Sequence, residues 1–295
     1  MKIKKALEFD NYSLESEVLL CYLLKKDKPW LYSHQDDILT SDRTRRYQKL
    51  IFRRKKGEPI AYITHHKEFY GLDFYIDKNV LIPRPETELL VKEALDYCSS
   101  EARTKKVSSS RPPKAASNSK YRILDLGTGS GCIIVAIATN PKSLPADATR
   151  QTLQAGKILN FKFYATDISQ KALKIAQKNA KKHKVKIKFY KSDLFKNIPA
   201  NLKFNLIIAN LPYLWNNYPP FEPRLALDGG GDGLEIIKKF LKQAKNHLNK
   251  RSTILLEIDP RQVSKIKKLI KKYLSKKKVS IKKDLAGLDR TAILR

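Results

Sequence analysis

Apolar residues recur at helix-like intervals in several parts of the chain and form short continuous runs in others. Between residues 14 and 24 and between residues 234 and 248 they recur every three or four positions, which is typical of an amphipathic helix. The period shortens in residues 58–82, where apolar pairs predict short strands. From residue 121 onward, short apolar runs alternate with helical patterns. These runs are seven candidate strands: 121–126, 161–166, 185–190, 204–209, 253–258, 279–282 and 291–294.

The order of these segments predicts an α/β fold in the second part of the chain. Short apolar strands that alternate with amphipathic helices are typical of a doubly wound, mostly parallel sheet. No helix-length segment separates the last two strands, so we expect them to form an antiparallel hairpin. Residues 1–56 are expected to be helical. In residues 58–82, strands are predicted around Tyr62, Phe69, Phe74 and Val80, with turns at Gly71 and residues 77–79.

Two polar stretches interrupt this pattern. Residues 99–120 are rich in Ser, Lys and Pro, which predicts a linker or insertion rather than core, and a second polar insertion covers about 141–160. A helix is expected to begin at Pro85, whose missing N–H would be unpaired there in any case. The predicted organisation is a small helical N-terminal domain over residues 1–75, a β connector to about residue 84, and an α/β domain over residues 85–295.

The chain is strongly basic, with 60 Lys and Arg against 29 Asp and Glu and a formal net charge of +31. Such an excess is compatible with nonspecific contact to RNA, since cationic side chains replace counterions on phosphate. The charges are spread along the chain, however, and many lysines fall on the polar faces of predicted helices. The charge therefore does not decide the function.

Composition excludes several classes of protein. Hydrophobic residues make up 42% of the chain, enough for a core, which excludes wholesale disorder. The three cysteines, Cys21, Cys98 and Cys132, form no Cys-x-x-Cys pair, which excludes a disulfide scaffold and a thiolate zinc site. No apolar run approaches the roughly 18 residues of a membrane span, and the first residues lack the apolar segment of a signal peptide. We expect a soluble, cytoplasmic protein that needs no metal.

A glycine-rich loop, Asp125–Gly131, follows the first strand of the predicted sheet and precedes a helix. Ligands of doubly wound sheets bind beyond the carboxyl ends of the strands. A dinucleotide fold would have Gly-x-Gly-x-x-Gly and an acidic residue about 20 positions later. This loop is Gly-x-Gly-x-Gly, which favours S-adenosylmethionine over a nicotinamide cofactor. The candidate cofactor-binding residues in the loop are Gly127, Thr128, Gly129, Ser130 and Gly131.

Acidic residues also end the next two strands. Asp167 closes the second strand, where its carboxylate could accept hydrogen bonds from both hydroxyls of a ribose, each bond contributing about 1.5–3 kcal/mol. The alternative is that Asp167 caps the helix that begins near Gln170. Asp193 and Leu194 follow the third strand. Asp193 could accept a hydrogen bond from the amino group of adenine, and Leu194 could pack against its ring.

The fourth strand ends in Asn210-Leu211-Pro212-Tyr213, a tetrad that suits methyl transfer to a planar nitrogen. Such a nitrogen is a poor nucleophile because its lone pair is delocalised. The Asn210 side-chain oxygen and the Leu211 carbonyl could accept its two hydrogens, and Tyr213 could stack on the flat group. Adenine N6, cytosine N4 and a glutamine side-chain nitrogen all qualify, and an ordinary Asn-Pro turn is the alternative without function.

Several further segments closely resemble the PrmC/HemK family of release factor glutamine methyltransferases. They join the loop, Asp167 and the tetrad, and together the likeness covers nearly the whole chain apart from the two polar insertions. The segments are Gly57–Tyr62, Glu68–Leu72, Leu81–Glu88, Phe221–Gly230, Asp232–Leu234 and Asp284–Arg290.

The resemblance implies a seven-stranded class I S-adenosylmethionine-dependent methyltransferase domain and a small helical domain that helps to grip the release factor. It implies methylation of the glutamine side chain in the Gly-Gly-Gln loop of peptide-chain release factors. The implied cofactor-binding residues are Gly127–Gly131, Asp167, Leu194 and Asn210. The implied substrate-binding residues are Asn210, Leu211, Pro212 and Tyr213, with Asn210 and Tyr213 as the catalytic pair and Arg84, Glu86 and Glu88 in supporting roles.

This sequence departs from the family pattern at two positions. Leu211 stands where the family usually has proline, and Leu194 stands where an aromatic residue is common. Asn-Leu-Pro-Tyr is also the form of the motif in rRNA adenine dimethyltransferases, so an N6-adenine methyltransferase acting on RNA or DNA is one alternative. The others are a glutamine methyltransferase of ribosomal protein uL3 and a basic RNA-binding protein on an inactive scaffold. We expect a monomer.

Overall fold

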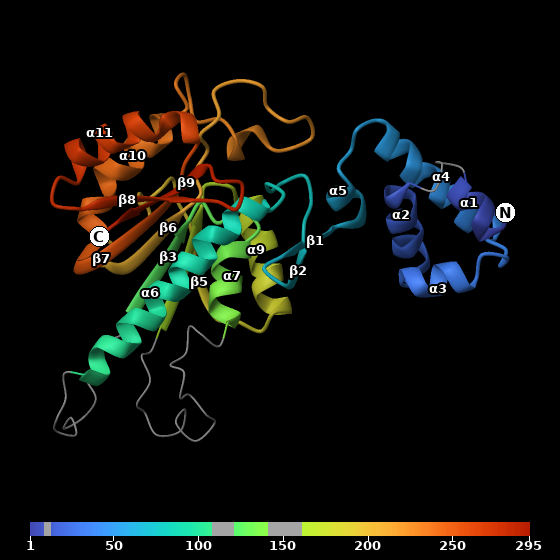
Figure 1. Cartoon of the computed structure of the whole chain (residues 1–295), viewed down its shortest axis with the longest axis horizontal. Helices are drawn as coiled ribbons and strands as arrows, with labels where there is room; N and C mark the ends of the chain where they lie inside the picture. The colour runs from blue at the N-terminus through green and yellow to red at the C-terminus, as the bar shows by residue number, and fades with distance from the viewer. Residues whose placement is uncertain (9–12, 108–120, 141–160) are drawn as a thin grey trace. The chain divides into compact units, whose positions relative to one another are not determined.

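The computed structural model describes residues 1–8, 13–107, 121–140 and 161–295 (Figure 1). Its contacts divide the chain into two compact units. The first contains residues 1–67 and 76–78, and the second contains residues 68–75 and 79–295. Each unit has its own hydrophobic core.

In the described residues the first unit is a bundle of five helices, which confirms the helical prediction for residues 1–8 and 13–56. Side chains cap three of them: Ser13 accepts a hydrogen bond from Ser16 N–H, Asp27 from Trp30 N–H, and Thr40 from Arg43 N–H. The buried side chains include Leu7, Leu19, Leu31, Tyr47 and Ile51. The helices are α1 (Ile3–Glu8), α2 (Leu14–Leu24), α3 (Lys28–Ser33), α4 (Ser41–Lys55) and α5 (Ile60–Thr64).

Two of the four short strands predicted in residues 58–82 are confirmed. β1 (His66–Phe69) and β2 (Leu72–Tyr75) form a hairpin whose turn residues, Tyr70 and Gly71, both have positive φ, at 54° and 72°. The turns at Gly71 and in residues 77–79 are also present.

The strands predicted around Tyr62 and Val80 are wrong. Tyr62 lies in α5, because a short apolar run after a proline fits a single helical turn as well as a strand. Val80 and Ile82 are buried in an extended segment that forms no ladder within the described residues. Pro83 and Pro85 remove two of the N–H donors that a ladder would need.

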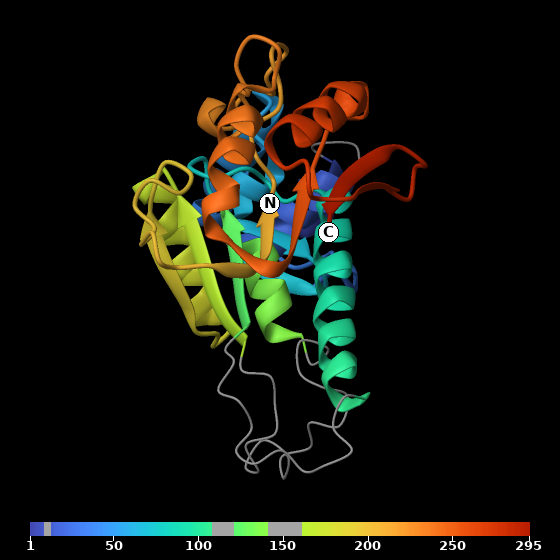
Figure 2. The same ribbon diagram turned by 90° about the vertical axis from the view of Figure 1, so that its left-hand side faces the viewer.

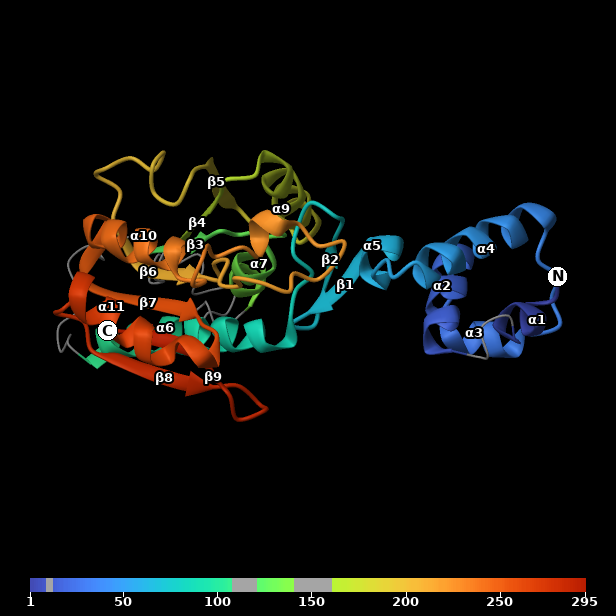
Figure 3. The same ribbon diagram turned by 90° about the horizontal axis from the view of Figure 1, so that it is seen from above.

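The second unit is built on a seven-stranded mixed sheet, as predicted, and its strand order is β5-β4-β3-β6-β7-β9-β8 (Figure 3). Its first five strands are parallel, and β9 runs antiparallel to both β7 and β8. The strands are β3 (Tyr121–Leu126), β4 (Phe161–Asp167), β5 (Ile187–Lys191), β6 (Phe204–Ala209), β7 (Leu248–Glu257), β8 (Val279–Lys283) and β9 (Asp289–Leu294).

Helices cover both faces of this sheet because its central strands are apolar on both sides. Leu124, Ile207 and Ile254 face a core that includes residues of α10 (Glu235–Ala244) and α11 (Val263–Tyr273). The other face packs against α6 (Glu88–Val107) and α7 (Cys132–Thr139), and α7 also contacts α9 (Gln170–Lys182) (Figure 2). The short 3-10 helices are η1 (Pro85–Thr87), η3 (Arg224–Ala226), η4 (Lys245–His247) and η5 (Pro260–Gln262).

The first polar stretch is shorter than predicted. The chain turns helical at Pro85, as expected, but α6 continues to Val107, so the predicted linker is wrong for residues 99–107. These residues contain no Gly or Pro to end the helix. The rest of that stretch, 108–120, and the predicted insertion at 141–160 lie outside the described residues. In the described part of the chain, no helix has both the length and the hydropathy to cross a membrane.

Candidate functional site

The glycine-rich loop runs from the end of β3 across the end of β4. Gly127 N–H and Thr128 N–H both donate to the Thr166 carbonyl, at 2.9 and 2.8 Å. Gly127 and Gly131 have φ values of 74° and 80°, and a Cβ at Gly131 would lie 3.1 Å from the Ala176 Cβ. The loop therefore needs glycine for its backbone conformation and for its close approach to α9.

The two hydroxyl side chains of the loop face inward rather than toward solvent. Thr128 and Ser130 are buried, and the Thr128 hydroxyl donates to Asp125 Oδ2 at 2.6 Å. Burial raises the pKa of Asp125 to about 7, although the bond from Thr128 opposes the shift. A Cβ at Gly129, by contrast, would meet nothing within 4 Å. The loop thus has an anchored side and an open side.

Asp167 is the last residue of β4, and two backbone groups hold its carboxylate. Gly129 N–H donates to Oδ2 at 2.9 Å and Ser169 N–H donates to Oδ1 at 2.8 Å. Asp167 is not the cap of the next helix, because the Ser169 side chain caps α9 through Ala172 N–H. Each Asp167 oxygen keeps the capacity to accept a further hydrogen bond. Burial raises the pKa of this carboxylate.

The two candidate residues after β5, Asp193 and Leu194, differ in burial. Asp193 is exposed, whereas Leu194 is buried in the core that faces α10 and has a φ of 50°. The side chain at position 194 therefore packs into the core, and its predicted contact with adenine stays a prediction.

The tetrad follows β6 and lies beside the glycine-rich loop, because β6 and β3 are neighbours in the sheet. Leu211 is buried, and its Cδ2 would lie 3.3 Å from a Cβ at Gly127. Asn210, Pro212 and Tyr213 are half-buried. The strand order β4-β3-β6 thus brings Asp167, the loop and the tetrad to one edge of the sheet.

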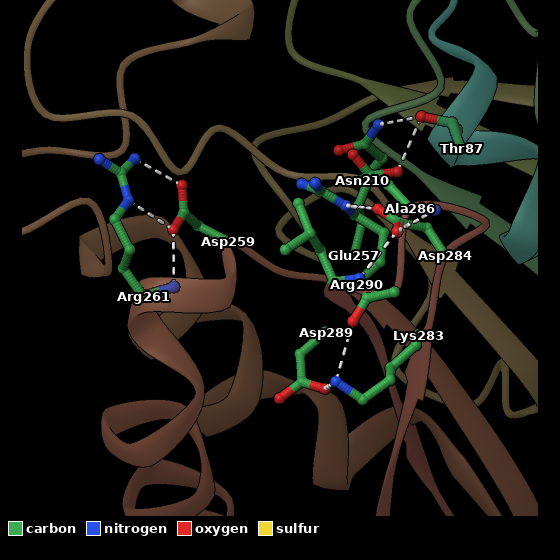
Figure 4. Close-up of polar contacts among 12 residues, drawn as sticks. Thr87, Asn210, Glu257, Asp259, Arg261, Lys283, Asp284, Ala286, Asp289 and Arg290 are labelled. Atoms are coloured by element: carbon green, nitrogen blue, oxygen red, sulfur yellow. Dashed lines mark hydrogen bonds and ion pairs between the residues drawn. The ribbon is translucent and has the colours of Figure 1, made fainter.

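A polar network behind the tetrad contains two residues that the sequence did not single out, Thr87 and Glu257 (Figure 4). Asn210 Nδ2 donates to Thr87 Oγ1 at 3.2 Å, and Thr87 Oγ1 donates to Glu257 Oε2 at 2.8 Å. Tyr213 OH donates to Glu257 Oε1 at 3.3 Å. Glu257 could have been noticed as the acidic residue that ends the apolar run of β7, next to β6. Thr87 gave no such signal.

The carboxyl group of Glu257 is buried. Its side chain and that of Thr87 are each 2% exposed. Burial raises the pKa of Glu257 to about 7, while Thr87, the positive charge of Arg290 and Tyr213 oppose that shift. Burial and the neighbouring Glu257 also raise the pKa of the Tyr213 phenol.

A second glycine-rich segment, residues 228–234, supports the backbone of the tetrad. A Cβ at Gly229 would lie 2.8 Å from the Pro212 carbonyl oxygen, and one at Gly233 would lie 2.2 Å from the Tyr213 carbonyl oxygen. The Gln262 side chain donates to that same Tyr213 oxygen at 3.1 Å. Only glycine allows these close approaches, so this segment and Gln262 together fix the path of the chain after Pro212.

Of the three charged residues expected to support the site, Arg84 and Glu88 have separate partners. Arg84 forms an ion pair with the buried side chain of Glu222, which links η1 to the segment beyond the tetrad. Glu88 accepts a hydrogen bond from Tyr70 N–H at 2.9 Å, and Glu86 is exposed. Within the described ranges, no group of three or more His, Cys, Asp or Glu residues is placed to hold a metal ion.

Comparison with known proteins identifies both parts of the chain. The PrmC N-terminal domain family matches residues 4–64, and a methyltransferase domain family matches residues 117–290. The release factor glutamine methyltransferase of Koribacter versatilis is 33% identical over 301 residues, which cover 99% of this chain and 94% of that protein. The protein of the same name from Coxiella burnetii is 35% identical over 288 residues, covering 96% and 91%.

A third protein of that name, from Dictyoglomus turgidum, is 33% identical over 296 residues and covers 97% of this chain and 92% of its own length. The likeness thus extends through both compact units rather than being confined to the methyltransferase domain. The chain belongs to the release factor glutamine methyltransferase family.

Proposed function

We propose that this protein transfers a methyl group from S-adenosylmethionine to the side-chain nitrogen of the glutamine in the Gly-Gly-Gln loop of peptide-chain release factors. The observation that carries the proposal is the meeting of Asp167, the glycine-rich loop and Asn210 at one edge of the sheet. The first two suit a nucleoside-containing cofactor, and Asn210 suits an amide substrate. Since release factors act in translation, we propose that the reaction takes place in the cytoplasm.

The residues at this edge fit S-adenosylmethionine. Each Asp167 oxygen can accept one ribose hydroxyl in addition to its backbone bond. The open side of Gly129 leaves room for a ligand against the loop backbone, Gly127–Gly131. Leu194 and Asn210 complete the proposed cofactor-binding set. When bound, the cofactor supplies an electrophilic methyl group on its sulfonium.

The tetrad would orient the substrate amide nitrogen, which is a poor nucleophile, and favour its attack on the methyl group. Asn210 Oδ1 and the Leu211 carbonyl would accept its two hydrogens, which orients the nitrogen and favours positive charge on it as the new bond forms. The Tyr213 ring would pack against the flat amide, adding about 0.5–1.5 kcal/mol. Leu211 in place of the usual proline keeps the carbonyl acceptor, and its buried side chain anchors the tetrad against Gly127.

Positioning then provides most of the rate enhancement. Holding the two reacting groups together can lower a barrier by roughly 7–11 kcal/mol. The nitrogen is positively charged directly after transfer and is then strongly acidic, so water can take its proton. No strong general base is needed, in agreement with the roles given to Asn210 and Tyr213.

The helical unit is proposed to grip the release factor outside the methylated loop. Its core is formed within the unit, which leaves its surface for a partner. Three large apolar side chains on this surface, Leu14, Ile38 and Phe52, are between 58% and 75% exposed. These exposed side chains are the candidates for contact with the release factor.

One assay tests the proposal against its alternatives. The purified protein is incubated with labelled S-adenosylmethionine and, in parallel, with release factor, ribosomal protein uL3 and rRNA fragments. We expect label on the release factor only, and loss of that label when its Gly-Gly-Gln glutamine is replaced by alanine. Label on rRNA or uL3 but not on the release factor would overturn the proposal.

A site variant completes the test. Asn210→Ala should abolish methyl transfer, whereas S-adenosylmethionine should still bind in calorimetry, because Asn210 is only one of several proposed cofactor contacts. Turnover near that of the wild type would show that the tetrad does not hold the substrate.

A further inference from the structure

We propose that Thr87 and Glu257 fix the orientation of the Asn210 side-chain amide, so that Asn210 presents its oxygen and not its NH2 group to the substrate nitrogen. Both are positioning residues, since they act through Asn210. The inference rests on the proposed function, because it assigns a purpose to residues behind the same site.

The direction of the hydrogen bonds follows from the donors and acceptors available. An ionised carboxylate only accepts, so the single hydroxyl proton of Thr87 must point at Glu257 Oε2. The Thr87 oxygen is then left to accept, and Asn210 must turn its Nδ2 toward it. Asn210 Oδ1 consequently points away from Thr87 and is available as an acceptor. In the opposite orientation the NH2 group of Asn210 would face the NH2 group of the substrate amide, and no hydrogen bond could form between the two donors.

The same carboxylate also holds the other catalytic residue. Glu257 Oε1 accepts a hydrogen bond from the Tyr213 hydroxyl, so one side chain at the end of β7 positions both Asn210 and Tyr213. Thr87 and Glu257 are both 2% exposed, so bulk water does not compete for these bonds. A buried carboxylate is unfavourable for folding, and its hydrogen bonds with Thr87 and Tyr213 offset part of that cost.

Protonation of Glu257 would reverse this network. A protonated Glu257 can donate to Thr87, Thr87 can then donate to Asn210 Oδ1, and the substrate acceptor is lost. The charged and titratable groups around Glu257 include Arg290 on β9, which favours the ionised form, and Glu86 on η1, which opposes it. They also include the phenol of Tyr213 and the thiol of Cys132 at the start of α7. Burial nonetheless raises the pKa of Glu257 to about 7. We therefore expect kcat to fall as the pH drops through this region.

Three variants test the network. Thr87→Val and Glu257→Gln should each lower kcat by at least about tenfold, the effect of losing one hydrogen bond to a charged group. Binding of S-adenosylmethionine should change by less than about threefold. Thr87→Ser keeps the hydroxyl and should restore most of the activity. The pH dependence of kcat near neutrality should disappear in Thr87→Val.

The chain offers a matched control. Thr291 lies directly opposite Glu257 in the β7–β9 ladder, is fully buried, and its hydroxyl has no partner in the described structure. Thr291→Val makes the same chemical change as Thr87→Val at a neighbouring buried position outside the site. Its kcat and pH profile should match those of the wild type.

A direct measurement does not depend on the substrate. The side-chain amide signals of Asn210 in a ¹H–¹⁵N NMR spectrum, assigned from their absence in Asn210→Asp, should shift with pH near neutrality in the wild type but not in Glu257→Gln. The inference is overturned if these signals are insensitive to pH and to Thr87→Val, or if Thr87→Val and Glu257→Gln keep wild-type kcat. A wild-type protein that modifies no release factor would instead refute the proposed function, whatever the NMR result.

Discussion

Leu211 lies against Gly127: its Cδ2 would be 3.3 Å from a Cβ placed on that glycine. This contact joins the tetrad to the glycine-rich loop, so a change in one is transmitted to the other. It also gives position 211 a purpose that proline would serve less well, because leucine reaches further across the edge of the sheet.

Gly127→Ala should therefore weaken cofactor binding and methyl transfer together. The added methyl group meets Leu211, and the φ of 74° is unfavourable for alanine by roughly 1–2 kcal/mol. Gly71→Ala is the control, because Gly71 has a φ of 72° but nothing within 4 Å of its Cβ. Calorimetry should show a higher Kd for S-adenosylmethionine only in Gly127→Ala. Equal Kd values in the two variants would contradict the prediction.

Gly233→Ala should disrupt the backbone that supports the tetrad. Its Cβ would come within 2.2 Å of the Tyr213 carbonyl oxygen, so the segment must move, at a cost of about 1–3 kcal/mol or more. Gly287→Ala shares a positive φ, 79°, but meets no atom within 4 Å. Urea unfolding should show a larger loss of stability in Gly233→Ala than in Gly287→Ala, accompanied by loss of methyl transfer. Comparable losses of stability in the two variants would mean that the positive φ, and not the contact with Tyr213, causes the destabilisation.

The ion pair between Arg84 and Glu222 should matter for the segment beyond the tetrad. The Glu222 side chain is 4% exposed and its second oxygen has no partner among the described residues, so Arg84→Ala leaves a buried carboxylate without compensation. We expect a loss of about 1–3 kcal/mol in the free energy of unfolding. Adding Glu222→Gln to Arg84→Ala should recover part of it. A double variant no more stable than Arg84→Ala would show that the two side chains are not coupled.

Much of this architecture follows from local pattern. The seven strands were predicted to within a few residues because apolar runs such as 204–209 are bounded by polar turns, although β7 begins at Leu248, five residues before the predicted start at 253. The glycine-rich loop, Asp167 and Asn210 were each recognisable from their place at the end of a strand. What could not be predicted depends on tertiary contact. Thr87 and Glu257 are 170 residues apart, and neither position is unusual until η1 and β7 are brought together.

Two buried carboxyl groups should make stability depend on pH. Burial raises the pKa of Asp125 from 3.8 and that of Glu257 from 4.5, in each case to about 7. Between these values the folded state binds more protons than the unfolded state, so stability falls as the pH rises through this window. Asp125→Asn removes one such group. Relative to the wild type, this variant should become more stable in urea unfolding as the pH is raised from about 5 to about 8. A difference that does not change with pH would refute the pKa shift of Asp125.

The proposed grip on the release factor should appear as a change in KM rather than in kcat. A single glutamine side chain offers few contacts, so most of the affinity for a protein substrate must come from surface outside the active site. Phe52 on α4 is 58% exposed and carries Lys56 Nζ 4.5 Å from its ring centroid, which makes it a good candidate for such a contact. Phe52→Ser should raise KM for the release factor by about threefold to tenfold, within the range for truncating an interface residue. Its kcat and its Kd for S-adenosylmethionine should not change.

The control is Leu285→Ser, which alters a fully exposed apolar residue between β8 and β9 and should leave KM as in the wild type. Identical KM values for the wild type and Phe52→Ser would remove Phe52 from the proposed binding surface.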